Sequence, residues 1–474
     1  MLFCSQQFVA FFAVVFAAYW ILPWPRARVW LLLVASYVFY ASWNSGLAIL
    51  ICFTTVVDYW LARGIDAASS PRLRKALLAV SVVGNLGLLA YFKYANFFLR
   101  SLESALHAAG AQAALPVLSV ILPIGISFYT FEAINYTVDV YRRRIPAERS
   151  LPDFLLFILF FPHMIAGPIV RAADFLPQIR RPKRWSWLRA NLGVQLLILG
   201  VFKKLAIADR MAIFADPVFA DPTQFRTTAL WMATFAYALQ VYCDFSGYSD
   251  IALGTAHLLG YKLAQNFNAP FAARNIADFW RRWHMSLGSW FRDYLFVPLG
   301  GSRGSEWTTA RNYLIVFTLC GLWHGANWPM VAWGALHGLM LIVHRHFHRF
   351  CERRPRLAAL WGTPWGTASA VALTIAFFCA SLVVFRNQSL GAAGQMFVGM
   401  AFGAAGRGPP INGTVLAFAI GVVAIGHVAS VRARWPRWVA AWPSPIRGLA
   451  LAATMSVALL LAPAAGQAFI YFHF

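Results

Sequence analysis

Two histidines, each preceded by a tryptophan, have the chemistry to act as acids and bases in this chain. Trp283–His284 lies in FWRRWHMSLGSWFRDYLFVPLGG and Trp323–His324 in LCGLWHGANWPMVAWGALHG. A neutral imidazole can take a proton from a hydroxyl near physiological pH and return it to a leaving group. Acyl transfer from a thioester to an alcohol needs such a base and a group that stabilises the tetrahedral oxyanion. His324 could be the base, with Asn327 as oxyanion donor or as orienter of the histidine.

Structural roles compete with this chemistry at both histidines. A histidine in a helix break, such as His324, can simply hydrogen-bond a carbonyl. His284 lies in an arginine-rich stretch, where it can bond a neighbour. Arg281 and Arg282 could attract the phosphates of a carrier on the cytosolic side, or anchor to lipid headgroups. Spacing alone leaves these alternatives open.

Neither the remaining histidines nor the cysteines indicate a metal site. The H-x-H-x-H run places alternate histidines on different faces of a helix, and the arginines between and after them repel a cation. The six cysteines are scattered without a C-x-x-C pair, so neither a zinc site nor a disulfide framework is predicted. We therefore expect no metal and no tightly bound cofactor. The histidines of the run are His344, His346 and His348.

Composition predicts an all-α, polytopic integral membrane protein. Of the 474 residues, 60% are hydrophobic and 12% charged, and the apolar runs are long enough to cross a hydrocarbon core of about 30 Å. The net charge of +23 is concentrated in short segments between these runs, where the positive-inside rule places basic residues. Topology and lipid contact therefore explain the charge without a nucleic-acid partner.

The apolar runs predict about twelve spans with both termini outside, in a single membrane domain over residues 1–474. Basic clusters flank 153–170 on both sides, and this segment contains a Gly-Pro break, which favours a re-entrant segment. The polar residues within 122–144 are expected to face the protein interior. The predicted spans are 7–23, 29–43, 46–62, 76–98, 122–144, 187–206, 228–258, 309–345 (interrupted), 366–386, 411–430 and 446–463.

The elements around the two histidines suggest different depths for them. Residues 262–308 mix aromatics with arginine as an interfacial helix does, which places His284 on the basic, cytosolic side. The HGANWP interruption of 309–345 places His324 deeper, at a broken helix that must line a cavity or be buried in protein. Asp244, within 228–258, is not expected to face lipid. We interpret His284 as the entrance and His324 as the reaction centre.

A set of motifs resembles the membrane-bound O-acyltransferase family. The resemblance is strongest to its bacterial branch, which serves alginate, peptidoglycan or cellulose O-acetylation and teichoic acid D-alanylation. The core motifs fall within about 120–340 and a tail motif within 469–474. They are PIGISFYTFEAINYTVDVYR, FFPHMIAGPIVRAADFLPQI, FKKLAIADR, YCDFSGYSDIALG, NFNAPF, FWRRWHMSLGSWFRDYLFVPLGG, GLWHGANW and FIYFHF.

The resemblance implies a ring of about 11–13 transmembrane and re-entrant helices around a thinned centre, with a tunnel from cytosol to exterior. It implies that His324 is essential, and that His284 is the second recurrent histidine, near the tunnel with Ser286. Trp283, Trp323, Asn327 and Asp244 become supporting or tunnel residues. The tail motif implies Tyr471 as an acyl carrier, for which an aromatic anchor at the interface is the alternative. His163 departs from the family pattern, which has another polar residue there.

The function implied is transfer of an acetyl group from a cytosolic thioester, acetyl-CoA, across the inner membrane of a bacterium. A separate extracytoplasmic acyltransferase would then modify a polysaccharide such as alginate. Two other functions remain open on the sequence. One is a polysaccharide or small-molecule transporter or channel, although paired repeats with broken helices are not visible. The other is an acyltransferase that acts on a secreted protein or lipid.

Overall fold

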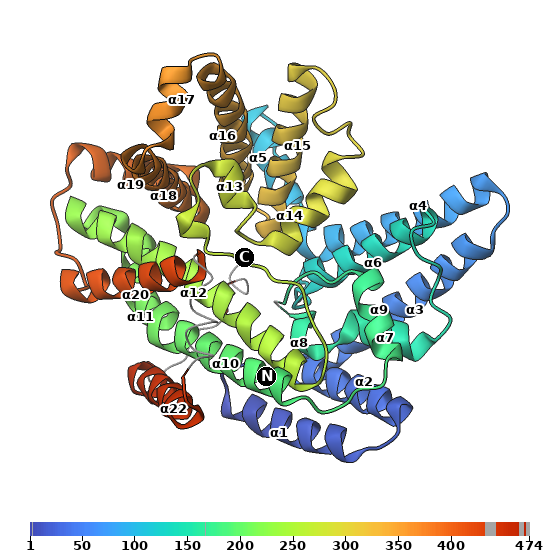
Figure 1. The fold of residues 1–474 in the computed structure, drawn as a ribbon. Coiled ribbons are helices and arrows are strands. Elements are labelled where there is room, and N and C mark those ends of the chain that lie inside the picture. Colours follow the sequence, from blue (N-terminus) through green and yellow to red (C-terminus); the bar gives the residue numbers. More distant parts are fainter. Residues whose placement is uncertain (2, 166, 432–441, 464–468, 471–474) are drawn as a thin grey trace. The chain divides into compact units, whose positions relative to one another are not determined.

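Every regular element among the described residues is a helix (Figure 1), which confirms the predicted all-α class. The computed structural model describes residues 1, 3–165, 167–431, 442–463 and 469–470. The chain divides into two compact units. The first contains Met1–Leu197 and Ile251–Ala264, and the second contains Ile198–Asp250 and Gln265–Phe474.

The first unit follows the predicted spans closely, because local signals mark where its helices start. Ser5, Asn44 and Ser70 each cap a helix by accepting a backbone N–H, as residues of these types prefer to do. Prolines occupy the first turns of α2, α4 and α7. The helices are α1 (Gln6–Ile21), α2 (Pro25–Ala41), α3 (Ser45–Ala67), α4 (Pro71–Leu89), η1 (Ala90–Tyr94), α5 (Ala95–Ala108), α6 (Ile126–Tyr141), α7 (Leu151–Leu159), α8 (Phe161–Met164), α9 (Ala172–Arg180) and the first part of α10 (Trp187–Phe202).

The polar residues of α6 face the protein interior, as the sequence predicts. Glu132, Asn135 and Asp139 are all buried. The Asn135 amide donates to the Val170 carbonyl at 3.1 Å, and the Val170 N–H donates to Glu132 at 2.8 Å. These hydrogen bonds give the buried groups the internal partners that a membrane interior requires.

The segment predicted to be re-entrant forms two short helices. α7 contains 9 residues and α8 contains 4, with a break at Phe160. At about 1.5 Å per residue, α7 rises roughly 14 Å, which is about half of the hydrocarbon core. Such a helix cannot cross the membrane alone, and the re-entrant path of the segment stays a prediction. His163 of α8 lies 3.3 Å from the Glu132 carboxylate.

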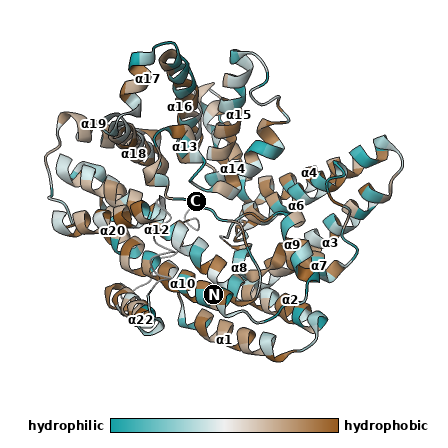
Figure 2. Cartoon of the chain, in the orientation of Figure 1, coloured by the Kyte–Doolittle hydropathy of each residue, from teal (hydrophilic) through white to brown (hydrophobic). Residues whose placement is uncertain are grey.

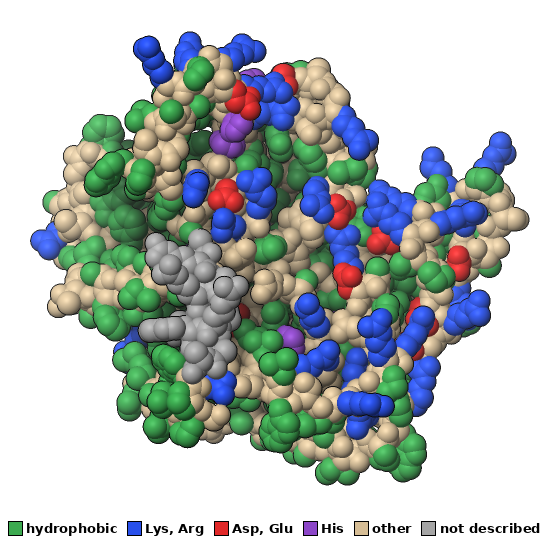
Figure 3. Space-filling model, in the orientation of Figure 1, with side chains coloured by type: hydrophobic (Ala, Val, Ile, Leu, Met, Phe, Trp, Pro, Cys, Tyr) green, Lys and Arg blue, Asp and Glu red, His purple; other side chains and the backbone are tan. Residues whose placement is uncertain are grey.

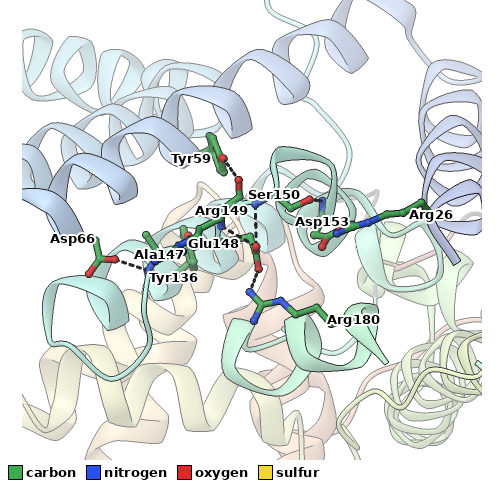
Figure 4. A network of polar contacts seen from close by, with 10 residues as sticks. All are labelled: Arg26, Tyr59, Asp66, Tyr136, Ala147, Glu148, Arg149, Ser150, Asp153 and Arg180. Carbon is green, nitrogen blue, oxygen red and sulfur yellow. Dashed lines mark hydrogen bonds and ion pairs between the residues drawn. The ribbon is translucent and has the colours of Figure 1, made fainter. Parts of the chain in front are cut away.

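A network of polar contacts holds the basic loop between α6 and α7 (Figure 4). Glu148 is buried, and its carboxylate accepts the backbone N–H groups of Arg149 and Ser150 at 2.8 and 3.0 Å, as well as the Arg180 guanidinium. The Tyr136 hydroxyl accepts the Glu148 N–H at 2.8 Å. Three further contacts hold the same segment: Asp66 with Ala147, Tyr59 with Arg149 and Arg26 with Asp153.

We expect Glu148→Ala to destabilise the protein by about 3 kcal/mol. The substitution leaves two partly buried N–H groups and one half-exposed guanidinium without their acceptor. The thermal unfolding midpoint in detergent measures the effect, with Glu352→Ala as the control, because Glu352 is exposed at the end of α16. An unchanged midpoint for Glu148→Ala would contradict a stabilising role for this network.

The second unit contains the helices that carry both Trp-His pairs. Consecutive lysines in its π-helical turn pair with carboxylates of α12: Lys203 with Asp250 at 2.6 Å and Lys204 with Asp244 at 2.7 Å. The helices are the end of α10, η2 (Lys203–Ala208), α11 (Asp209–Ala220), η3 (Pro222–Gln224), most of α12 (Thr227–Leu258), η4 (Pro270–Ala272), α13 (Ile276–Trp280), α14 (Met285–Phe291), η5 (Arg292–Phe296), α15 (Glu306–His324), α16 (Trp328–Glu352), α17 (Pro355–Gly362), α18 (Pro364–Arg386), α19 (Leu390–Phe402), α20 (Gly413–Val431) and α22 (Ser444–Leu461).

Six of the described helical stretches are long and apolar enough to cross a membrane. Figure 2 shows the predominance of hydrophobic residues along α1 and α22, and Figure 3 shows Lys and Arg side chains gathered over α2, α3, α4, α7 and α9. The larger predicted number of spans stays a prediction, because α1 has only 16 residues and α15 is more polar than the six. The six stretches are Ser45–Ala67, Pro71–Ala108, Trp187–Ala220, Pro364–Arg386, Gly413–Ser430 and Ser444–Leu461.

Candidate active site

His324 is the last residue of α15, at the break that the HGANWP motif predicts. α15 ends there and α16 begins at Trp328. Asn327 is the N-cap of α16, and its side-chain oxygen accepts the Met330 N–H at 2.9 Å. Asn327 thus has a helix-capping contact through its oxygen, and its expected role as oxyanion donor or histidine orienter, through its NH₂ group, stays a prediction. The break itself is where the sequence places it.

The two helices of this hairpin touch through their backbones. A Cβ atom on Gly321 would lie 2.1 Å from the Met330 carbonyl oxygen, and one on Gly334 would lie 2.2 Å from the Phe317 carbonyl oxygen. Glycine is required at a crossing this close, because any side chain would push the helices apart. Gly321 is three residues before His324, so the same contact sets the position of the histidine.

His284 lies in a strained turn between α13 and α14. Its backbone φ is 44°, in the left-handed region that residues other than glycine rarely adopt. Asn266 holds the turn: its carbonyl accepts the Met285 N–H at 2.9 Å, and its side-chain oxygen accepts the Ser286 hydroxyl at 2.6 Å. The Asn266 amide then donates to Ser249 on α12 at 3.2 Å. Asn266 belongs to the NFNAPF motif, in which no local signal indicates a contact with Ser286.

The structure brings the two histidines together. Their ring centroids lie 6.5 Å apart, and Trp323 packs edge-on against both, at 5.8 Å from His284 and 4.9 Å from His324. Both histidines are buried, with 0% and 3% exposure. The two histidines are therefore neighbours in the fold, and the interpretation of His284 as the entrance and His324 as the reaction centre stays a prediction. Instead of lying flat at an interface, the chain around His284 folds into two short helices that pack inward.

Burial also determines the charge of His284, which lies outside the candidate spans. Desolvation lowers its pKa to about 3. Its imidazole is therefore neutral at physiological pH and carries one N–H. The Phe245 ring of α12 covers it, with 4.6 Å between ring centroids. A neutral imidazole in this position can donate one hydrogen bond and accept another.

A small cavity opens beside His324, with about 20 Å³ of space for a molecule the size of water, which is room for about one water. Among the described residues that line it, His324 is the one titratable side chain, and the rest of the wall is aromatic or aliphatic. Trp283 is in this wall, as expected for a supporting residue. The other lining residues are Val241, Phe279, Trp280, Trp333, Phe378, Leu382, Phe385 and Ile470.

His337, which is also buried, supports the cavity wall. The Trp280 indole N–H donates to His337 Nδ1 at 3.3 Å, and His337 Nε2 lies 3.1 Å from the Ser381 hydroxyl. Ser381 donates to the Phe378 carbonyl at 2.7 Å, so its oxygen accepts from His337 Nε2–H. His337 is thus a neutral bridge from α13 through α16 to α18. Sequence reasoning missed this role, because nothing local pairs His337 with Trp280.

The two arginines predicted on the donor side differ in their surroundings. Arg282 donates to Asp278 at 3.0 Å and to the Asn268 carbonyl at 3.3 Å. These contacts connect the segment before α14 to Asn268. The Arg281 side chain is 73% exposed and lies 3.9 Å from Asp278. Asp244 is buried and paired with Lys204, which agrees with its predicted avoidance of lipid. Tyr471 lies outside the described residues.

A buried histidine pair at a broken helix, beside an aromatic cavity in a multi-pass membrane protein, defines a candidate site for acyl transfer. The family model of MBOAT, the membrane-bound O-acyltransferase family, matches residues 140–385. The chain belongs to this family and is an acyltransferase. The matched region contains both Trp-His pairs.

Three relatives of this chain have acyl-transfer activities in their names. A probable alginate O-acetylase of Pseudomonas aeruginosa is 40% identical over 84% of this chain and 75% of its own length. A peptidoglycan O-acetyltransferase of Helicobacter pylori is 34% identical over 84% of this chain and 80% of its own. A teichoic acid D-alanyltransferase of Bacillus subtilis is 28% identical over 56% and 69%.

We expect Asn266→Ala to lower acyltransferase activity about 10²-fold, because His284 and Ser286 lose the side chain that holds their turn. Asn268→Ala is the matched control: in the described structure the Asn268 contacts to Arg282 use only its backbone. Activity in purified protein, normalised to folded protein, measures the difference. Equal activities of the two variants would show that Asn266 does not position the turn.

Proposed function

We propose that this chain transfers an acetyl group from acetyl-CoA, a cytosolic thioester, toward O-acetylation of an extracytoplasmic polysaccharide such as alginate. The observation that carries the proposal is the position of His324, as the titratable side chain on the wall of a buried, mostly aromatic cavity. The names of the relatives support the acetyl group and the polysaccharide acceptor. A wall of this kind excludes water, which protects a thioester from hydrolysis.

In the proposed reaction, His324 is the general base. An acceptor hydroxyl attacks the thioester carbonyl, and His324 takes the hydroxyl proton as the new C–O bond forms. The tetrahedral intermediate collapses with cleavage of the C–S bond, and the imidazolium returns the proton to the departing thiolate. The reaction therefore needs no oxidant, reductant or metal to balance.

The oxyanion of the intermediate needs a hydrogen-bond donor, for which we propose His284. Its neutral imidazole carries one N–H, and its ring centroid lies 6.5 Å from that of His324. Asn327 is a second candidate, because the cap on α16 uses its side-chain oxygen and leaves its NH₂ group able to donate. A preorganised donor in a dry site is worth about 10²–10³ in rate.

The remaining parts of the proposal concern delivery and release. Arg281 is exposed and would attract the phosphates of the donor, since guanidinium groups bind phosphate well. Tyr471 would carry the acetyl group, and a separate extracytoplasmic acyltransferase would pass it to the polymer. Such a relay places the chain in the inner membrane of a bacterium. The described residues just before Tyr471, Phe469 and Ile470, lie against the candidate site, which favours a role for the tail.

Mass analysis of surface polymers from cells with and without the protein tests this function. We expect the O-acetyl content of one polysaccharide to disappear with the protein and to return on complementation. Unchanged polysaccharide together with loss of acylation on a secreted protein or a lipid would assign a different acceptor. Unchanged acylation of all three classes would contradict acyl transfer to an extracytoplasmic acceptor.

A further inference from the structure

A buried cation–carboxylate cluster near the candidate site takes no part in the proposed chemistry. Lys204 Nζ lies 2.7 Å from both the Asp209 and the Asp244 carboxylates, and no side chain of the three is more than 3% exposed. Lys204 and Asp209 flank the turn from η2 to α11, and Asp244 lies in the middle of α12. Hydrophobic replacement of a buried ion cluster is often neutral or stabilising. A contribution to stability is therefore not a sufficient reason for a charged cluster at this position.

The cluster also holds Phe469 and Ile470, the two described residues of the C-terminal motif, which together are called the tail below. Asp244 uses one carboxylate oxygen for Lys204 and the other for the backbone N–H of Ile470, which donates to it at 2.7 Å. The contact joins residues 226 positions apart in sequence. Phe469 is fully buried, and its ring centroid lies 4.2 Å from that of Tyr248 and 6.0 Å from that of Phe245 on α12. The tail is thus attached by a charge-assisted hydrogen bond and a buried ring.

The attachment point is part of the cavity. Ile470 lines the same cavity as His324, next to Val241 of α12. Phe245, against which Phe469 packs, also covers the His284 ring. The tail therefore touches the surroundings of both histidines, although about 150 residues or more separate it from them in sequence.

We propose that Asp244 is a positioning residue, which Lys204 and Asp209 hold in place so that the tail forms a wall of the His324 cavity. A carboxylate suits this task because it has two acceptor oxygens, one for the lysine and one for the amide. The buried lysine keeps the carboxylate compensated at a depth where a lone charge is costly. The consequence for activity rests on the proposed function, whereas the attachment itself does not.

Asp244→Asn tests the attachment. An asparagine is neutral, so the ion pair with Lys204 is lost. Its one acceptor oxygen is attracted to the Lys204 ammonium, which turns the NH₂ group toward the Ile470 N–H and removes that hydrogen bond. Lys204 keeps Asp209 as its partner in this variant. Asp250→Asn is the matched control, because Asp250 is also a carboxylate on α12 paired with a lysine, Lys203, and it has no contact with the tail among the described residues.

Hydrogen–deuterium exchange of the full-length protein in lipid nanodiscs, resolved to the Ile470 amide, gives the direct measurement. We expect this amide to be protected in the wild type and in Asp250→Asn, and to exchange roughly ten- to a hundredfold faster in Asp244→Asn. Fast exchange of Ile470 in the wild type would overturn the proposal. Equal protection in Asp244→Asn and the wild type, or equal loss in both variants, would do the same.

Ile470→Pro provides the second variant if Asp244→Asn does not fold. It removes the N–H and leaves Lys204, Asp209 and Asp244 in place. We expect faster exchange of the Phe469 amide, together with a kcat for acetyl transfer about 10²-fold lower at an unchanged KM for acetyl-CoA. Full activity with a released tail would overturn the role of the tail as a cavity wall. Lack of activity in the wild type would contradict the proposed function and leave the exchange result to decide the attachment.

Discussion

His324→Ala is expected to abolish O-acetylation of the polymer while the protein still inserts and accumulates in the membrane. His324 is the titratable residue that the structure places on the cavity wall, and loss of a general base lowers a rate by about 10²–10⁴-fold. The variant removes an imidazole from a helix end without adding volume. Polymer O-acetyl content in cells, together with the amount of protein in membranes, measures both parts of the expectation.

His348→Ala is the matched control for this experiment. His348 is another helical histidine, on α16, with a side chain that is 63% exposed and paired with Glu352. It should leave O-acetylation unchanged. His284→Ala should lie between the two, because it removes the proposed oxyanion donor and leaves the base. Polymer that is fully O-acetylated in cells carrying His324→Ala would remove His324 from the mechanism.

Gly321→Ala is expected to lower acetyl transfer about 10²-fold or more and to destabilise the protein by about 1–3 kcal/mol. Its Cβ atom would lie 2.1 Å from the Met330 carbonyl oxygen, a backbone atom that cannot rotate away. α15 and α16 must therefore separate, and His324, almost one helical turn further on, moves with them. Transfer activity and the thermal unfolding midpoint of the purified protein measure the two effects.

Gly421→Ala is a control in which the expected change in stability has the opposite sign. Gly421 lies within α20, and a Cβ atom there meets nothing within 4 Å. Since alanine favours a helix over glycine by up to about 1 kcal/mol, this variant should be slightly more stable and fully active. If Gly321→Ala had the same transfer activity and the same unfolding midpoint as Gly421→Ala, the close contact of α15 and α16 would not be needed to position His324.

Much of the fold could be predicted from the apolar periodicity, because membrane spans are local features. The helix break at HGANWP and the inward-facing polar residues of α6 are both where the sequence indicates them. The cap at Asn327 also has a local signal, since an asparagine followed by Trp328 and Pro329 is a typical helix start.

The arrangement around His284 could not be predicted, because it depends on contacts between segments far apart in sequence. The aromatic and arginine pattern of residues 279–294 is typical of an interfacial helix. The structure instead divides it at His284, whose left-handed backbone is held by Asn266 and, through it, by Ser249 of α12. The same holds for His337, whose partners Trp280 and Ser381 come from two other helices.

The measurement that tests the central claim most directly is release of free CoA thiol from acetyl-CoA by purified protein in lipid nanodiscs, compared between the wild type and His324→Ala. We predict thioester cleavage coupled to acyl transfer in the wild type and cleavage at the level of protein-free nanodiscs in the variant. His348→Ala should match the wild type. Equal thiol release by wild type and His324→Ala, at equal amounts of folded protein, would contradict the assignment of His324 as the base for acetyl transfer.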